Sequence, residues 1–269
     1  MKKIVFCDID GTLANNKNIS TKNIDLINKY SSLGGVFVLI SGRSVAYTRN
    51  IASKFKNLKY IICNNGSIIY DLVNDRVVYY RGLLYSTVKE IYDLCKKNNV
   101  KFIVTGIDYD YVNADPNVGN IQKLFTTLDE KLIEDNYTTQ LIASSNIEDN
   151  ILFLEEEVNK LDSIEVINKA RVLYDPNYID NSYWLDLASP GINKGDAVKK
   201  LCDIIGVELF DTVRIGNDLN DLSMFFDEGV NVAVFDSYDE VKKRASFITK
   251  TCNDGGVAFV LDKIINEEI

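Results

Sequence analysis

Two aspartates, Asp8 and Asp10, stand one residue apart at the end of a short apolar run and are well placed to do chemistry. The preceding residues 4–6 are β-branched and aromatic, as in a buried strand, and Gly11 follows as a turn residue. Open parallel sheets bind ligands at the carboxyl ends of such strands. If strand geometry continues, both carboxylates point to one face, where they repel each other unless a cation or a shared proton lies between them. A hard cation such as Mg²⁺ prefers these oxygen ligands.

The alternative to a cation site is an ordinary strand end followed by an Asp-Gly turn. A second polar turn argues against this alternative. Residues 36–40 form another apolar run, which leads directly into Ser41-Gly42-Arg43. A hydroxyl beside a turn rich in backbone N–H groups suits an anionic oxygen. The serine could instead simply cap the following helix.

A third candidate, Lys194, opens a predicted helix over residues 196–205. A lysine is unfavourable at a helix N-terminus, because the macrodipole there prefers anions. Its position therefore indicates a role beyond solubility, although most lysines lie on the surface.

The fourth segment follows a predicted strand over residues 212–215. It begins at Gly216 and brings four oxygen-bearing side chains into one loop: Asn217, Asp218, Asn220 and Asp221. Such a loop at a strand end can complete a cation site. A turn that caps the following helix is the alternative.

The composition excludes several classes of function. The chain has 269 residues, with 30 lysines and arginines against 39 aspartates and glutamates, a formal net charge of -9. Such an acidic chain argues against a nucleic-acid partner, since phosphate backbones bind basic surfaces. Histidine is absent, which excludes His-dependent triads and zinc mechanisms. Chemistry must therefore use carboxylates, lysine, hydroxyls and a metal ion.

Neither a targeting segment nor a membrane span is expected. The first apolar stretch runs directly into Asp8 and is too short for a signal-peptide core or a spanning helix. The five cysteines are scattered without CxxC spacing, which argues against a disulfide framework and a zinc site. We therefore expect a cytoplasmic protein with no membrane partner.

The elements that must position these residues alternate between short strands and helices at both ends of the chain. Beyond those above, strands are predicted over residues 60–63 and 230–235, and helices over residues 21–33 and near 222–226. This alternation predicts an α/β fold with a doubly wound, Rossmann-like parallel sheet.

The middle of the chain has a different pattern, with longer alternating strands predicted over residues 101–112 and 163–174 and a helix over residues 147–161. We therefore predict an α+β domain, residues 82–186, inserted into a core domain made of residues 1–81 and 187–269.

In this order, DxDGT, SGR, Lys and GNDxND, the motifs resemble those of the haloacid dehalogenase superfamily of phosphatases. Within it the chain resembles the Cof-type sugar-phosphatase branch, whose large α+β cap lies between the second and third motifs. The turn at residues 64–67, the closing segment 254–257 and the short connection 13–20 agree with this branch. The resemblance implies a cytoplasmic, Mg²⁺-dependent phosphomonoester hydrolase acting on a small phosphorylated metabolite such as a sugar phosphate. A phosphosugar mutase or phosphotransferase, or a non-catalytic sugar-phosphate-binding regulator, is the alternative.

The resemblance also implies roles for individual residues. Asp8 would be the nucleophile that forms an aspartyl-phosphate, and Asp10 the general acid and then the general base. Ser41 and Lys194 would hold the phosphoryl oxygens. The full set comprises the catalytic residues Asp8, Asp10 and Lys194; the phosphate-binding residues Gly11, Thr12, Ser41, Gly42 and Asn220; the residues facing substrate and cap, Arg43 and Asn65; and the metal ligands Asp8, Asp10, Asn217, Asp218 and Asp221.

One residue departs from the family pattern, in which an aspartate that binds Mg²⁺ follows the glycine of the last motif. Here that residue is Asn217. An amide oxygen can bind Mg²⁺ but adds no charge, so metal affinity should fall unless Asp218 or Asp221 compensates.

Overall fold

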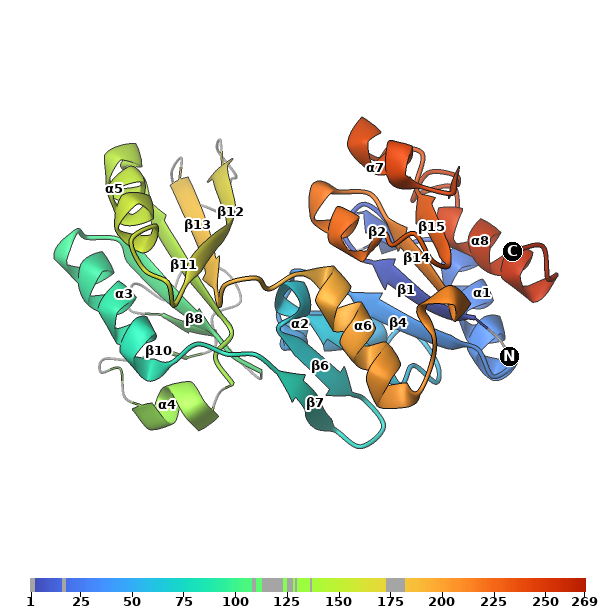
Figure 1. Cartoon of the computed structure of the whole chain (residues 1–269), viewed down its shortest axis with the longest axis horizontal. Coiled ribbons are helices and arrows are strands. Elements are labelled where there is room, and N and C mark those ends of the chain that lie inside the picture. The colour runs from blue at the N-terminus through green and yellow to red at the C-terminus, as the bar shows by residue number, and fades with distance from the viewer. Residues whose placement is uncertain are drawn as a thin grey trace. The chain divides into compact units, whose positions relative to one another are not determined.

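A computed structural model describes residues 3–15, 18–107, 110–112, 123–124, 128, 130–135, 137–172 and 182–269. The chain divides into two compact units (Figure 1). The core unit comprises Met1–Tyr79 and Asn193–Ile269, and the inserted unit comprises Tyr80–Ile192.

Within its described residues the core unit contains an eight-stranded sheet in the order β16-β15-β14-β1-β4-β5-β6-β7. The strands are β1 (Ile4–Asp8), β4 (Val36–Ile40), β5 (Tyr60–Cys63), β6 (Ile68–Asp71), β7 (Arg76–Tyr80), β14 (Thr212–Gly216), β15 (Val230–Ala233) and β16 (Phe247–Ile248). From β16 to β5 all neighbours are parallel, and β6 pairs antiparallel with β5. A separate pair, β2 (Ala14–Asn15) and β3 (Asn18–Ile19), follows β1. The predicted parallel sheet is confirmed.

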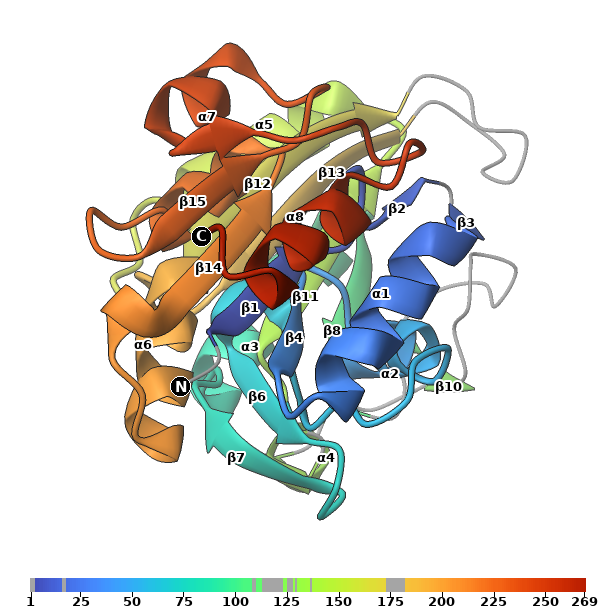
Figure 2. The same cartoon turned by 90° about the vertical axis from the view of Figure 1, so that its right-hand side faces the viewer.

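Helices cover both faces of this sheet. They are α1 (Thr21–Ser32), α2 (Val45–Ala52), α6 (Lys194–Ile205), α7 (Asp239–Arg244) and α8 (Gly256–Ile265), with 3₁₀ turns η1 (Asn64–Gly66), η2 (Leu209–Asp211) and η3 (Leu219–Met224). On one face Phe6 and Val38 pack against Val198 and Leu201 of α6. Because side chains alternate along a strand, their neighbours point to the other face, where α1 and α8 lie side by side (Figure 2). The predicted helix near residues 222–226 is the turn η3.

Strand register brings the polar loops to one edge of the sheet. Asp8 at the end of β1 lies beside Ile40 at the end of β4, and Cys7 lies beside Ile215 of β14. Since the three strands are parallel, the segments that follow them leave from the same edge. Those segments carry Asp10, Ser41 and Asn217.

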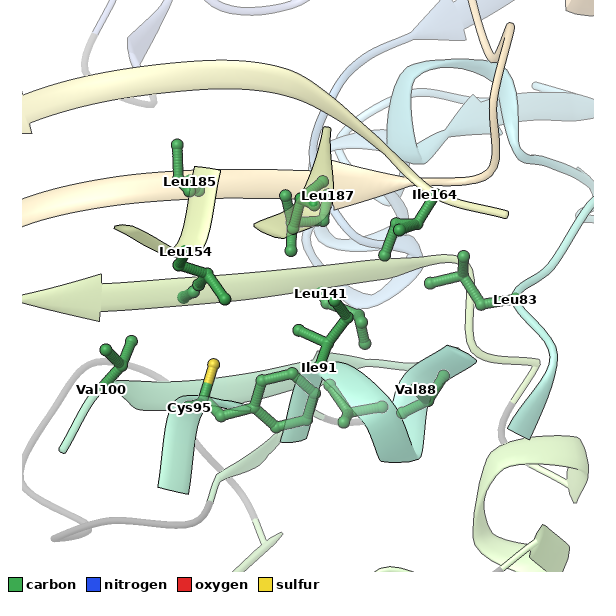
Figure 3. Close-up of a cluster of buried hydrophobic side chains, with 14 of the residues drawn as sticks. Leu83, Val88, Ile91, Cys95, Val100, Leu141, Leu154, Ile164, Leu185 and Leu187 are labelled. Carbon is green, nitrogen blue, oxygen red and sulfur yellow. The ribbon is translucent and has the colours of Figure 1, made fainter. Parts of the chain in front are cut away.

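The inserted unit has its own sheet and its own apolar core. Its described strands follow the order β10-β9-β8-β11-β13-β12 and, apart from the parallel pair β9 and β10, are antiparallel. The elements are β8 (Lys101–Thr105), β9 (Asp110–Val112), β10 (Lys123–Leu124), β11 (Gln140–Ser145), β12 (Glu165–Val172) and β13 (Ser182–Ala188), with α3 (Tyr85–Lys97), α4 (Glu130–Asp135) and α5 (Glu148–Val158). Val88 and Ile91 of α3 and Leu154 of α5 pack on Leu141 and Leu185 of the sheet (Figure 3).

The sequence prediction of one strand over residues 101–112 is wrong. The segment forms two strands, β8 and β9, that pair antiparallel with Ile103 beside Val112. Both halves have strand-like residues, and hydrophobic alternation alone does not report a reversal between them. The strand predicted over residues 163–174 is β12, and residues 173–174 lie outside the described part of the chain.

The division between the units falls at residues 79/80 and 192/193, whereas the sequence placed it at 81/82 and 186/187. Strand β13 continues to Ala188, and the Gly191 amide donates to the Glu165 carboxylate at 2.8 Å. These contacts attach the segment after residue 186 to the inserted unit. None of the described helices is long and apolar enough to span a membrane.

Candidate active site

A buried lysine between two carboxylates lies at the carboxyl edge of the core sheet. Lys194 Nζ donates to Asp8 Oδ1 and to Asp221 Oδ1, both at 2.6 Å. The side chains of Lys194, Asp8 and Asp221 are 1%, 8% and 0% exposed. Lysine is rarely buried to this extent unless it is paired, so this geometry excludes an ordinary surface role for Lys194.

Local structure fixes the position of Lys194. Asn193 caps α6 through its side chain, which accepts from Asp196 N, so that Lys194 is the first residue of the helix. A Cβ atom on Gly195 would lie 1.9 Å from the carbonyl oxygen of Ser223 in η3. Only glycine therefore lets α6 approach η3 this closely, and the approach brings Lys194 to Asp221.

The three groups carry one positive and two negative charges when all are ionised. The pKa of Asp8 is raised to about 7, first by burial and then by the charge of Asp221, while Lys194 acts against both. Burial alone would lower the pKa of Lys194, but Asp221 and Asp8 raise it above its ordinary value. Lys194 therefore remains a cation, and once Asp8 is ionised the group has a net negative charge that favours a further cation nearby.

Asp221 is occupied by protein donors on both carboxylate oxygens. Besides the Lys194 contact, its Oδ2 accepts from the backbone N–H groups of Asn217 at 2.8 Å and Asp218 at 3.0 Å. Asp218 is exposed, and its carboxylate caps η3 by accepting from Leu219 N. The carboxylates of Asp221 and Asp218, both predicted metal ligands, thus accept hydrogen bonds from Lys194, from the backbone of their own loop and from the start of η3.

Asn217 lies directly beside Asp8 and Asp10. One end of its side-chain amide is 2.7 Å from Thr12 Oγ1, 3.2 Å from Asp8 Oδ2 and 3.1 Å from the Asp10 carbonyl oxygen. These acceptors assign the amide nitrogen to that end. Thr12 is fully buried, and the only side-chain hydrogen bond described for its hydroxyl is to Asn217.

Gly11 is required for this contact. It has φ of +81°, which favours glycine, and a Cβ atom there would lie 2.5 Å from the Asn217 amide. The turn after β1 can therefore approach the loop after β14 only without a side chain at this position.

Asp10 has a carboxylate held by Arg43 and Tyr47. Arg43 Nε donates to Asp10 Oδ2 at 3.0 Å and Nη2 to Oδ1 at 3.4 Å, and the Tyr47 hydroxyl is 3.5 Å from Oδ1. The Arg43 guanidinium also lies 5.3 Å from the centre of the Tyr47 ring. Sequence reasoning missed Tyr47, which could have been found from its position four residues after Arg43 in the segment that begins α2.

The remaining predicted residues gather beside this group. Buried Ser41 accepts at Oγ from Arg43 N at 3.1 Å. Asn220 Nδ2 donates to Asn65 Oδ1 at 3.3 Å, and a Cβ atom on Gly42 would lie 2.9 Å from that same oxygen. Loops after β4, β5 and β14 therefore contribute hydroxyl and amide groups to one edge.

The side chains fit a hard cation at one position. No group of three or more Asp, Glu, Cys or His residues suited to a metal occurs in the described part of the chain. However, Asp8 Oδ2, the Asp10 carbonyl oxygen and one end of the Asn217 amide converge, and rotation of that amide would present a third oxygen. Oxygen-only ligands of this kind suit Mg²⁺.

Comparison with known proteins identifies the family. A sequence model of the haloacid dehalogenase-like hydrolases matches residues 5–261. The chain belongs to this family. It is 28% identical over 258 residues to a 5-amino-6-(5-phospho-D-ribitylamino)uracil phosphatase of Bacillus subtilis, covering 95% of this chain and 93% of the relative. A phosphoglycolate phosphatase of Methanobrevibacter smithii is 24% identical over 260 residues, with 96% of each chain covered.

Solved structures agree with the fold. A haloacid dehalogenase-like hydrolase from Bacteroides thetaiotaomicron superposes with a TM-score of 0.80 at 22% identity, over 98% of this chain and 100% of its own. The predicted superfamily and the predicted enzyme class, a phosphatase, are therefore confirmed.

Proposed function

We propose that this haloacid dehalogenase-like hydrolase is a Mg²⁺-dependent phosphomonoesterase in which Asp8 is the nucleophile. The observation that carries this proposal is the buried contact between Asp8 and Lys194 at the end of β1, beside the Asp10 carbonyl oxygen and the Asn217 amide. A fixed cation next to a carboxylate at a strand end suits attack on a phosphate dianion, since the cation offsets the repulsion between two anions.

The proposed reaction has two halves. In the first, an Asp8 oxygen bonds to phosphorus while the bond to the leaving oxygen breaks, and Asp10 gives its proton to that oxygen. In the second, Asp10 takes a proton from water, whose oxygen attacks phosphorus and releases inorganic phosphate and the free Asp8 carboxylate. Mg²⁺ held by Asp8, the Asp10 carbonyl oxygen and Asn217 would offset charge between the nucleophile and the phosphate.

Lys194 remains protonated throughout, because Asp8 and Asp221 raise its pKa. Its role is therefore to hold the phosphoryl oxygens as a fixed positive charge and not to transfer protons. The hydroxyl of Ser41, from the neighbouring strand end, supplies a further donor to the same oxygens.

We propose a phosphate ester of a small hydroxylated molecule, such as a sugar or sugar alcohol, as substrate. The support is the name of the Bacillus subtilis relative, a phosphatase of a phosphoribityl compound, which is similar over 95% of this chain. The phosphoglycolate phosphatase among the relatives is named for a different small phosphate ester, so the substrate differs within this family.

The test is release of inorganic phosphate from p-nitrophenyl phosphate with Mg²⁺ and with EDTA, followed by a panel of sugar and sugar-alcohol phosphates. We expect Mg²⁺-dependent release that Asp8→Asn abolishes. Absence of release from every ester would favour a regulatory binding protein and overturn the proposal. Interconversion of hexose 1- and 6-phosphates without release of phosphate would instead indicate a mutase.

A further inference from the structure

Asn217 can contact Asp8 and the Asp10 carbonyl oxygen in two chemically opposite ways. We propose that the Asn217 side-chain amide reverses its orientation when a cation binds. Its NH₂ group donates to these two oxygens when no cation is bound, and its carbonyl oxygen turns toward the cation on binding. This inference rests on the proposed Mg²⁺ site. It adds that the carboxyl edge of the sheet keeps its structure without the metal and binds Mg²⁺ loosely.

The first argument is the partners of the inner end of the amide. As nitrogen it donates to Asp8 Oδ2 at 3.2 Å and to the Asp10 carbonyl oxygen at 3.1 Å. As oxygen it would face two other oxygens, an arrangement that is favourable only with a cation among the three. The orientation of the amide is therefore linked to the presence of a cation.

The second argument is that both orientations keep the contact to Thr12. A hydroxyl can donate or accept, so Thr12 Oγ1 donates to the amide oxygen or accepts from the amide nitrogen at the same 2.7 Å. Thr12 is fully buried, which holds this partner in place. Rotation of the amide therefore leaves Thr12 with a partner in either orientation, and in the nitrogen orientation the two amide hydrogens are shared among Thr12 Oγ1, Asp8 Oδ2 and the Asp10 carbonyl oxygen.

The third argument is the charge around Asp8. Its Oδ1 contacts Lys194, whose Nζ is shared with Asp221, so this group already contains one more anion than cations. An aspartate at position 217 would place a further carboxylate about 3 Å from Asp8 Oδ2, where like charges repel strongly. The amide avoids this repulsion, at the expense of the attraction that a second carboxylate offers to Mg²⁺.

Nearby carboxylates in the same loop do not take over this position. Asp221 receives Lys194 and two backbone N–H groups, and Asp218 caps η3. Asn217 is thus the side chain of this loop, as the structure describes it, that reaches both Asp8 and the Asp10 carbonyl oxygen.

The experiment compares thermal unfolding in EDTA with Mg²⁺ affinity from calorimetry, both without substrate, for wild type, Asn217→Asp, Asn217→Ala and the control Asn50→Asp. Asn50 is exposed on α2 and receives the same change of charge. In EDTA we expect Asn217→Asp and Asn217→Ala to melt about 4 °C or more below wild type, since one adds repulsion and the other removes two hydrogen bonds. The control should melt with wild type.

Mg²⁺ affinity should move in opposite directions in the two variants. We expect it to rise about tenfold in Asn217→Asp, which adds a charged ligand, and to fall about tenfold in Asn217→Ala, which removes one. Specific ¹⁵N labelling of asparagine gives a direct readout, because the Asn217 side-chain NH₂ signal should shift on Mg²⁺ addition more than that of Asn50.

Either of two results overturns the proposal: Asn217→Asp melting with wild type in EDTA, or Asn217→Ala binding Mg²⁺ as tightly as wild type. If Asn217→Asp does not fold, Asn217→Ala still decides. These measurements use no phosphate ester, so failure of the hydrolase assay would leave this inference standing, and the reverse holds as well.

Discussion

Asp8 is a buried ionisable side chain, and its burial makes its contribution to stability depend on pH. Burial raises its pKa to about 7, whereas the pKa of an aspartate in an unfolded chain is about 4. The unfolded state therefore releases this proton first as pH rises. Stability contributed by Asp8 falls between about pH 4 and pH 7 and remains low above that range.

Asp8→Asn is accordingly expected to abolish turnover without destabilising the protein. An amide cannot form the acyl phosphate, but it keeps an oxygen that accepts from Lys194 and removes a buried negative charge. At about pH 8, in EDTA, the variant should melt at or above the wild-type temperature, and the difference should shrink toward about pH 4. Turnover above background in a contamination-free preparation, or a variant that melts well below wild type at about pH 8, would contradict this prediction.

Arg43 is expected to position Asp10 for proton transfer. Its guanidinium donates to both Asp10 carboxylate oxygens, which limits the rotation of that side chain. Arg43→Ala should lower kcat roughly tenfold to a hundredfold for alkyl phosphates, whose leaving groups need the proton, and less for p-nitrophenyl phosphate. Arg43→Lys should restore part of the loss. An equal loss with both kinds of leaving group would indicate phosphate binding by Arg43 in place of a positioning role.

At the scale of elements, a buried arginine in β14 connects the segments that precede β14 and β15 by hydrogen bonds. Arg214 is fully buried and donates to Asn231 Oδ1, at 3.0 Å from Nε, and to the carbonyl oxygens of Leu209 and Glu228. Burial lowers its pKa to about 10, which still leaves it charged at neutral pH. One side chain thus fixes the segments on both sides of the strand that leads to Gly216.

Arg214→Met should lower the free energy of unfolding by about 3 kcal/mol or more, because the Asn231 oxygen and the loop carbonyls would lose their donors in a dry interior. In thermal unfolding this corresponds to a fall in Tm of roughly 6–12 °C. The matched control is Arg76→Met, at an exposed position of β7, which should change Tm by much less. A loss no greater than that of the control would mean that water or other groups satisfy these carbonyls.

At the scale of the molecule, each unit has a separate apolar core. One cluster joins the core sheet to α6, and another joins α3 and α5 to the sheet of the inserted unit. No buried member of either cluster, among the described residues, comes from the other unit. Units with their own cores are expected to fold independently.

Joining residue 79 to residue 193 through a Gly-Ser linker should therefore give a folded core protein with a cooperative thermal transition. It should retain slow hydrolysis of p-nitrophenyl phosphate, because Asp8, Asp10 and Lys194 all lie in the core unit. Activity on the natural substrate should be lost. Aggregation at every linker length tested would show that the core unit depends on the inserted unit.

Local pattern was sufficient for much of the fold. Apolar runs bounded by glycine and polar turns predicted β4 and β5 with the bounds the structure has, and motif order predicted the superfamily. The predictions of β4 and β5 succeeded because buried parallel strands are short, continuous and apolar. Such strands can be located without information about distant residues. The reversal between β8 and β9 was missed because side-chain alternation continues on both sides of it.

At the site, sequence alone determined which residue types stand at the strand ends, namely Asp8, Asp10 and Ser41, and that a lysine, Lys194, stands at the start of a helix. Tertiary structure decided their partners, since Lys194 meets Asp8 across 186 residues of sequence and Asn217 meets Thr12 across 205. Asp221 and Asn217 stand in one loop motif, but in the folded chain Asp221 contacts Lys194 whereas Asn217 contacts the Asp10 carbonyl oxygen. The physical reason is that hydrogen bonds and ion pairs depend on distances of about 3 Å, which only the packing of α6 and η3 against the sheet establishes.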